Sequence, residues 1–385
     1  MRPLHAVALT ASVVLAGSNA FAQNCPARPM WPTHGWPSRT QEIASLRATE
    51  IAELERYAFT LTGTDEQRLG ARTDAVIIVH QGAIFYERYA RGFDAEMAHY
   101  TWSVSKTVTN ALAGIAVRRG DLAITDSICT HLGASLPRQD HCDIHVQNLL
   151  EFGSGLAWTE SYEGQSNQAS SVLAMLYGEG RNDMVSFILG HDTRAAPNTT
   201  YMYSSGDATA LAGVVDYAIR QHADENYPWT ELFTPLGMDS AVFERDPRGV
   251  FVGSSFFHAT PRDMAKFGFL YLNDGCWDGQ RILPEGWVHD STAVSDVFRT
   301  GTLLDLGDDD CQGRQIWLNH PVPEQHITQP WPDVPEDAFA ARGHWGQSIT
   351  VVPSLDAVIV RVADDRDPPQ GFFNGFVSRA LAVVR

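Results

Sequence analysis

Apolar residues follow a strand-like spacing near both ends of the chain and a helix-like spacing in the middle. Two β-branched runs within residues 74–89 flank Gln81-Gly82 and predict a β-hairpin. Apolar runs at 348–352 and 357–362, separated by Pro353-Ser354, predict a second pair of strands. From about residue 121 to 269 no strand-rich run occurs. The pattern therefore predicts strands at both ends that bracket a mostly helical centre.

Apolar residues at intervals of three or four predict the helices. One amphipathic helix is expected from Thr40, on the pattern Ile43, Leu46, Leu54 and Tyr57. A buried helix is expected to follow Ser103 and to continue until Gly120. Further helices are predicted at 146–150, 172–177, 184–189, 207–219, 262–272 and 373–384.

The N-terminus has the features of a secretory signal peptide, with Arg2, a short apolar stretch and an Ala-Phe-Ala ending at Ala22. We therefore predict a signal peptide at 1–22 and an exported protein, periplasmic or extracellular. No later stretch offers eighteen consecutive apolar residues, so no integral membrane segment is expected after its removal. Residues 23–60 are predicted to form a proline- and tryptophan-rich arm and a helix. Residues 61–385 are predicted to form one large domain, with the helical region at about 121–272.

Charge and cysteine content exclude several classes of function. A formal net charge of −18 argues against a nucleic-acid partner, because phosphate backbones are bound by basic surfaces. The five cysteines form no Cys-x-x-Cys and no zinc-like cluster, and the acidic run 308–310 lacks the alternating ligands of a calcium loop. No metal or organic cofactor is therefore expected. Disulfides are the better interpretation for an exported chain, and the first choice pairs Cys129 with Cys142 and Cys276 with Cys311, leaving Cys25 over.

Lysine is scarce in this chain, because only Lys106 and Lys266 contribute to a total of 28 Lys+Arg. Arginine cannot lose its proton in a protein, whereas a lysine can be tuned to act as a base. Lys106 stands three residues after Ser103, and on a helix this spacing brings two side chains within reach of each other. The pair predicts a serine nucleophile with a lysine base. A helix-start serine beside a solvated lysine is the structural alternative.

Two later segments extend this pattern. Tyr203-Ser204-Ser205 lies about a hundred residues after Ser103, just ahead of an apolar helix, and His344-Trp345-Gly346 leads into a predicted strand. In this order the three motifs resemble those of serine hydrolases of the class C β-lactamase-like family, which have the penicillin-recognising fold. The third motif departs from the family's Lys-Thr-Gly. It looks like the His-x-Gly variant of esterases and amide hydrolases related to 6-aminohexanoate-dimer hydrolase.

The resemblance implies an α/β fold in which an antiparallel sheet, flanked by helices, faces a mostly helical second region across a cleft. It also implies an acyl-enzyme reaction in which Ser103 attacks, Lys106 takes the proton and Tyr203 helps to protonate the leaving group. The backbone N–H groups of Ser103 and Gln347 would hold the oxyanion. Substrate contacts are expected from His344, Trp345, Gly346 and Ser205.

The resulting hypothesis is an exported serine hydrolase that cleaves a small-molecule carboxylic ester or amide. The first alternative is a β-lactamase or a D-amino-acid peptidase of the same fold, which the missing third-motif lysine disfavours. The second is a non-catalytic binding or sensing module, which the presence of the serine, lysine and tyrosine candidates disfavours. Substrate selectivity depends on cleft loops whose geometry a sequence does not show.

Overall fold

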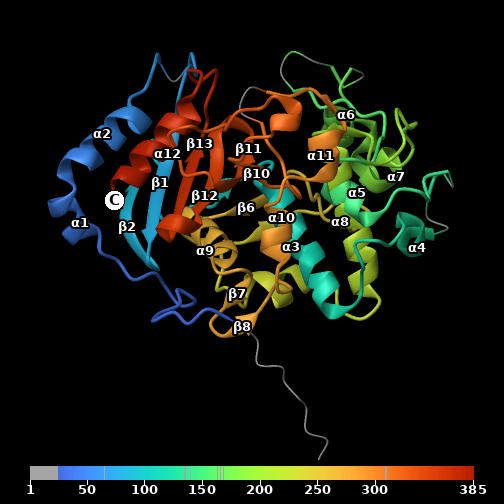
Figure 1. The fold of residues 1–385 in the computed structure, drawn as a ribbon, viewed down its shortest axis with the longest axis horizontal. Helices are drawn as coiled ribbons and strands as arrows, with labels where there is room; N and C mark the ends of the chain where they lie inside the picture. The colour runs from blue at the N-terminus through green and yellow to red at the C-terminus, as the bar shows by residue number, and fades with distance from the viewer. Residues whose placement is uncertain are drawn as a thin grey trace, which may run out of the picture.

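The computed structural model describes residues 25–385 except 65, 134, 135, 139, 163, 165, 168, 308 and 309. The signal peptide expected at 1–22 and the acidic residues 308 and 309 lie outside the described residues. A six-stranded antiparallel sheet, in the order β10-β11-β12-β13-β1-β2, forms one half of the molecule (Figure 1). Its strands are β1 (Thr73–His80), β2 (Ala83–Tyr89), β10 (Trp317–Leu318), β11 (Phe339–Gly343), β12 (Gln347–Val352) and β13 (Ala357–Ala363).

The sheet joins the two ends of the chain, because β1 pairs with β13 along its whole length. Side chains alternate between the faces of a strand, so Ile77 and Val79 enter one core while Val76 and Ile78 enter another. Helices α2 (Ala48–Phe59) and α12 (Phe372–Ala382) cover the second face, as Figure 1 shows on the left. Helices α3 (Val104–Arg119) and α9 (Pro261–Leu272) cover the first. Both faces are therefore buried.

The second half of the molecule is helical and gathers on the right in Figure 1. At its centre α8 (Ser205–Arg220) packs against α3, which is buried from Val104 to Ala116 and ends at Gly120 in the left-handed conformation. The other helices are α4 (Ile128–Leu132), α5 (Val146–Leu150), α6 (Ser171–Tyr177), α7 (Met184–Ile188), α10 (Trp287–Ser291) and α11 (Asp296–Thr300). Single 3₁₀ turns lie at Glu179–Asn182, Pro323–Gln325, His344–Gly346 and Pro353–Leu355, and a π-helical turn at Trp229–Phe233. Within the described residues, no helix combines the length and apolar character needed to cross a membrane.

Short elements were the ones that the sequence pattern missed. The missed helices are α4, α10 and α11, and the missed strands are β3 (His99–Tyr100), β4 (Thr200–Met202), β5 (Val242–Phe243), β6 (Phe257–Ala259), β7 (Cys276–Trp277), β8 (Gln280–Arg281), β9 (Thr302–Leu304), β10 and β11. Most contain two or three residues, too few for an alternating pattern to show. The single helix expected from Thr40 is also wrong, because the chain breaks at Arg47 between α1 (Thr40–Leu46) and α2. The break leaves Leu46, an expected core residue, 67% exposed.

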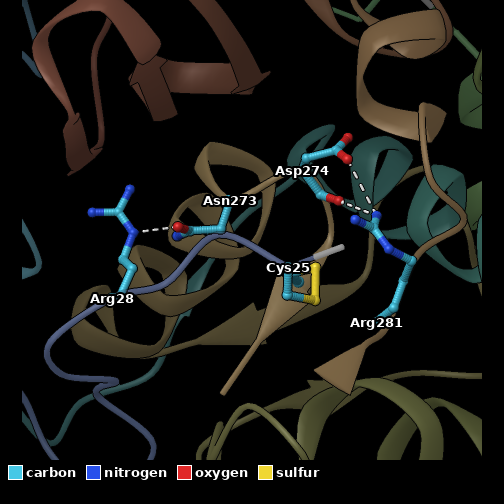
Figure 2. Close-up of a disulfide and its surroundings, with 6 residues drawn as sticks. Cys25, Arg28, Asn273, Asp274 and Arg281 are labelled. Atoms are coloured by element: carbon cyan, nitrogen blue, oxygen red, sulfur yellow. Dashed lines mark hydrogen bonds and ion pairs between the residues drawn. A yellow bond between two sulfur atoms is a disulfide. The ribbon is translucent and has the colours of Figure 1, made fainter. Parts of the chain in front are cut away.

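The N-terminal arm lies across α9. The disulfide at its first cysteine, Cys25, differs from the expected pairing. Cys25 is bonded to Cys276, with the two Cα atoms 5.6 Å apart, and Cys311 is a free, buried cysteine. Figure 2 shows why Cys25 reaches this position: Arg28, three residues on, donates a hydrogen bond to the Asn273 side chain at the end of α9.

Further contacts hold the arm in place. Arg28 also forms an ion pair with Asp356, and both Trp31 and Trp36 pack edge-on against Phe269. The tryptophan-rich arm is thus a packed part of the fold, and it carries Cys25 to the strand β7 that holds Cys276. The other expected pair, Cys129 with Cys142, is confirmed.

Candidate active site

The N-terminus of α3 is the centre of the site, with Ser103 as its N-cap residue and Lys106 in its first turn. Just before it, Trp102 has a positive φ of 50°, which is uncommon for a bulky side chain. The neighbouring Ser105 stabilises this bend, because its hydroxyl donates to the Trp102 carbonyl at 2.6 Å and accepts from the Phe257 amide at 3.0 Å. The Ser105 hydroxyl is therefore occupied with the backbone, and of these two serines it is Ser103 that contacts Lys106.

The Lys106 amine lies within hydrogen-bond distance of three oxygen atoms. Its Nζ is 3.0 Å from Ser103 Oγ, 2.9 Å from Ser205 Oγ and 3.2 Å from the carbonyl of Ser254. The residue is only 2% exposed. Burial lowers the pKa of Lys106 to about 8, although the nearby Glu160 carboxylate acts in the opposite direction. A large fraction of the amine can therefore be neutral at mildly alkaline pH.

Tyr203 directly precedes Ser204, the N-cap residue of α8, and its ring lies against the Lys106 amine. The Lys106 nitrogen is 4.7 Å from the centre of the Tyr203 ring, and the Tyr203 hydroxyl interacts with the Ser103 side chain. Burial and the Glu160 charge raise the pKa of Tyr203 well above its usual value, which the Ser103 contact only partly offsets. The phenol thus keeps its proton at neutral pH. Tyr201, two residues earlier, points elsewhere and packs against Phe298 in the core.

The third motif forms the turn between β11 and β12. Gly343 at the end of β11 pairs with Gln347 at the start of β12. A Cβ atom at position 343 would collide with the carbonyl of Thr101 and would lie 3.2 Å from the amide nitrogen of Ser103. Only glycine allows this approach, and it brings the start of β12 next to the start of α3. The two expected oxyanion donors, the amides of Ser103 and Gln347, are therefore on adjacent segments.

A buried ion pair supports this turn from behind. Arg361 and Asp365 are joined by two hydrogen bonds of 2.7 and 2.8 Å, and both are almost fully buried. Arg361 also donates to the backbone carbonyl of Gly346 at 3.1 Å. The backbone amide of Asp365 donates to the backbone carbonyl of Trp345 at 3.0 Å. These contacts stabilise two left-handed residues in sequence, Trp345 with φ of 60° and Gly346 with φ of 90°. For Trp345 this conformation costs about 1–3 kcal/mol, which the surrounding contacts must offset.

A segment that the sequence analysis missed completes the helical side of the site. Glu160 accepts hydrogen bonds from the Ser205 hydroxyl at 2.6 Å and from the Trp158 indole at 2.7 Å. The Tyr162 hydroxyl also donates to it, at 2.5 Å, while the Tyr162 ring stacks on His344 with ring centres 4.9 Å apart. Tyr162 thus reaches from the helical side to the third motif. No motif marks Trp158-Thr159-Glu160-Ser161-Tyr162 in the sequence, because its partners are distant along the chain.

The expected substrate contacts lie in two different environments. His344, Trp345 and Gly346 line a groove of about 670 Å³ that continues to the start of α12. Ser205 differs from the expectation, because it is fully buried and its hydroxyl already contacts Lys106 and Glu160. Its position behind the lysine leaves no surface for a substrate. No group of three or more His, Cys, Asp or Glu side chains within the described ranges is placed to hold a metal ion.

Comparison with known proteins agrees with this architecture. The Beta-lactamase family model matches residues 60–383. The chain belongs to the Beta-lactamase family. Among curated proteins it is 22% identical over 353 residues to the 6-aminohexanoate-dimer hydrolase of Paenarthrobacter ureafaciens, an alignment that covers 88% of this chain and 86% of the relative.

Solved structures of similar fold extend the comparison. The "Putative 6-aminohexanoate-dimer hydrolase" from Bacillus anthracis has a TM-score of 0.68 at 20% identity and covers 91% of this chain and 87% of its own. A penicillin-binding protein homologue from Caulobacter crescentus has a TM-score of 0.63 at 14% identity and covers 91% and 99%. This family member therefore has the β-lactamase/transpeptidase-like fold, with an antiparallel sheet and flanking helices, as the motif pattern implies.

Proposed function

We propose that this protein is an exported serine hydrolase that cleaves a carboxylic ester or amide through an acyl intermediate on Ser103. The observation that carries the proposal is the position of the buried Lys106 amine, 3.0 Å from Ser103 Oγ and with its pKa lowered to about 8. A serine hydroxyl is a weak nucleophile until a base takes its proton, and a neutral amine at this distance can do so.

In the proposed acylation step, Ser103 Oγ attacks the carbonyl carbon while its proton moves to Lys106 Nζ. The amides of Ser103 and Gln347 donate to the oxyanion that forms. Collapse of this intermediate breaks the bond to the leaving group, which takes the Tyr203 hydroxyl proton. The proton held by Lys106 then replaces it, because the raised pKa of Tyr203 makes a lasting phenolate unfavourable. Acyl-Ser103 and the free alcohol or amine result.

Deacylation follows the same path with water as the nucleophile. Water loses a proton to Lys106 and attacks the acyl carbon, while the two backbone amides again hold the oxyanion. Breaking the ester bond to Ser103 returns the proton to Oγ and releases the carboxylic acid. Every proton in this cycle is carried by Ser103, Lys106 or Tyr203.

The substrate class is argued from the third motif and from the relatives. The motif contains His344 where penicillin-specialised members of the family have a lysine, and this favours an ester or amide over a β-lactam. The name of the Paenarthrobacter relative describes the hydrolysis of a 6-aminohexanoate dimer, which supports including amides. Two disulfides, Cys25–Cys276 and Cys129–Cys142, fit a protein that works in an oxidising compartment.

Replacing the nucleophile tests this function. Ser103→Ala should abolish turnover of activated esters and amides and also covalent labelling by a serine-directed phosphonate, measured by mass spectrometry. Ser45→Ala is the matched control, because Ser45 lies exposed on α1. If Ser103→Ala still labels, the nucleophile is elsewhere and the proposal is wrong.

Two rival functions have distinct signatures. A burst of acylation by penicillin followed by rapid turnover would favour a β-lactamase, and release of a terminal D-amino acid would favour a peptidase. A non-catalytic module would show neither labelling of Ser103 nor turnover across a panel of activated esters and amides.

A further inference from the structure

We propose that Glu160 is a positioning residue that acts through the Ser205 hydroxyl to aim the lone pair of neutral Lys106 at Ser103. The inference rests on the proposed function, in which Lys106 is the base. It arises from a chain of short hydrogen bonds that runs from the Glu160 carboxylate through Ser205 Oγ to Lys106 Nζ, with distances of 2.6 and 2.9 Å.

Glu160 serves only as an acceptor in this arrangement. Its Oε1 accepts from the hydroxyls of Ser205 and Tyr162, and its Oε2 accepts from the Ser205 amide at 2.9 Å and the Trp158 indole at 2.7 Å. An amide and an indole N–H can only donate, so the carboxylate orientation is set by two rigid groups. Ser205 is held twice, by its backbone and by its side chain.

The hydroxyl of Ser205 has a single proton, and the carboxylate determines where it points. A hydrogen bond to a charged acceptor is stronger than one to a neutral group, so the proton lies on the 2.6 Å contact with Glu160. Ser205 Oγ is then left as an acceptor on its other side, where Lys106 Nζ lies at 2.9 Å. The carbonyl of Ser254, at 3.2 Å from the same nitrogen, is also an acceptor.

These two acceptors account for both protons of a neutral amine. One N–H of Lys106 points to Ser205 Oγ and the other to the Ser254 carbonyl, which leaves the nitrogen lone pair for the third neighbour, Ser103 Oγ at 3.0 Å. Ser103 can then donate its proton to Lys106 as it attacks. Without Glu160 the Ser205 proton is free to turn toward Lys106 and occupy the lone pair.

Glu160 also influences how readily Lys106 loses its proton. Burial lowers the pKa of Lys106 to about 8, and the Glu160 charge limits that decrease. Other titratable groups around this cluster are Tyr203 over the amine, Tyr162 on the Glu160 carboxylate, His344 stacked on Tyr162, and Asp207 in the first turn of α8. The pKa of Asp207 is raised to about 7 by burial, so its titration must be separated from that of Lys106.

The test is the pH profile of kcat/KM for an activated ester, measured from pH 5 to 10 in the full-length mature protein. In Glu160→Gln the side-chain amide oxygen accepts from the Trp158 indole and the Ser205 backbone amide, so the NH₂ group faces the hydroxyls of Ser205 and Tyr162. The NH₂ group then donates to Ser205 Oγ, and the Ser205 hydroxyl proton turns toward Lys106. We expect kcat/KM at the optimum to fall about 10²-fold and the acid limb to move to lower pH by about one unit. Glu160→Asp keeps the charge, so its acid limb should stay near the wild-type position while part of the rate returns.

Ser205→Ala tests whether Glu160 acts through the hydroxyl. We expect kcat/KM of Ser205→Ala to fall by a similar factor. In the double variant Ser205→Ala, Glu160→Gln, kcat/KM should fall little further, while the acid limb of its pH profile should still move to lower pH. Glu179→Gln, at an exposed glutamate of the 3₁₀ turn 179–182, is the matched control and should behave as wild type. Circular dichroism identifies a variant that does not fold, and in that case Glu160→Asp and Ser205→Ala still decide.

The outcomes separate this inference from the function on which it rests. A Glu160→Gln variant with an unmoved acid limb and a uniformly lower rate would show a merely structural role and overturn the proposal. Wild-type rates in both Glu160→Gln and Ser205→Ala would do the same while Ser103→Ala remains inactive. Retained turnover in Ser103→Ala would overturn the proposed function and this inference together.

Discussion

The two walls of the site hold their functional groups by different means. The sheet wall is the turn 343–347 between β11 and β12. It contains Gln347, the proposed oxyanion donor, whose backbone position follows from strand pairing and from a buried ion pair, Arg361–Asp365. The helical wall consists of residues 158–162 and 203–205, and it presents side chains joined by hydrogen bonds to Glu160. Backbone hydrogen bonds and an ion pair hold one wall, whereas side-chain hydrogen bonds to a single carboxylate hold the other.

This difference predicts how each wall responds to change. Substitutions on the sheet wall move backbone atoms, so they should lower the rate equally at every pH. Substitutions on the helical wall alter charges and protons near Lys106, so they should change the shape of the pH profile. This difference also explains why glycines mark the sheet wall in the sequence, whereas residues 158–162 of the helical wall carry no motif.

The largest effect is expected for Lys106→Arg, at the boundary of the two walls. Arginine keeps its proton at all accessible pH values, so it cannot act as the base, and kcat/KM should fall by about 10³- to 10⁴-fold. The wild-type acid limb, governed by a pKa of about 8, should disappear. Lys266→Arg is the control, because Lys266 pairs with Asp263 on α9, away from Ser103. Near-normal turnover in Lys106→Arg would remove the base from the mechanism.

Gly346→Ala tests the sheet wall. The added Cβ would collide with the Arg361 and Asp365 side chains, and the left-handed φ of 90° disfavours alanine. Displacing the adjacent Gln347 amide should lower kcat by about 10²- to 10³-fold, with the acid limb unmoved. A shifted limb would mean that the sheet wall also controls the Lys106 proton.

Tyr203→Phe tests the helical wall without disturbing its packing. Phenylalanine keeps the ring beside the Lys106 amine, 4.7 Å from the nitrogen, and removes only the hydroxyl. Turnover of an amide should fall about 10²-fold, because a poor leaving group needs a proton donor. An activated ester with a good leaving group should be affected much less. Equal losses for both substrates would contradict the role of Tyr203 as the acid.

The last prediction concerns stability rather than rate, and it involves the buried Asp207 in the first turn of α8, next to the helical wall. Burial raises the pKa of Asp207 from 3.8 to about 7, so the folded state binds its proton more tightly than the unfolded state. That stabilisation is complete below pH 3.8 and is lost as the pH rises to about 7. Denaturant titrations between pH 3.8 and about 7 should therefore show the free energy of unfolding of the wild type falling by up to about 1.4 kcal/mol per pH unit relative to that of Asp207→Asn. A pH-independent difference would contradict the raised pKa.

Long periodic elements were predictable because local pattern determines them. The helix after Ser103 ends at Gly120 as expected, and the hairpin turns at Gln81-Gly82 between β1 and β2. Edge strands such as β10, with two residues, depend on pairing rather than on their own sequence and could not be found in this way. Cys276 was paired with the wrong cysteine for a related reason: its partner, Cys25, is separated from it by 251 residues and is brought to it by the packing of the arm.

By itself the sequence determined the alternation of strands and helices and the three motifs around Ser103, Tyr203 and His344, because these depend on spacing along one segment at a time. Only the tertiary structure decided that Glu160 and Ser205 lie behind Lys106 and that Gly343 lies against Thr101. The physical reason is that hydrogen bonds and ion pairs act over a few ångströms in space. Residues brought that close by folding carry no mark of their proximity in the chain.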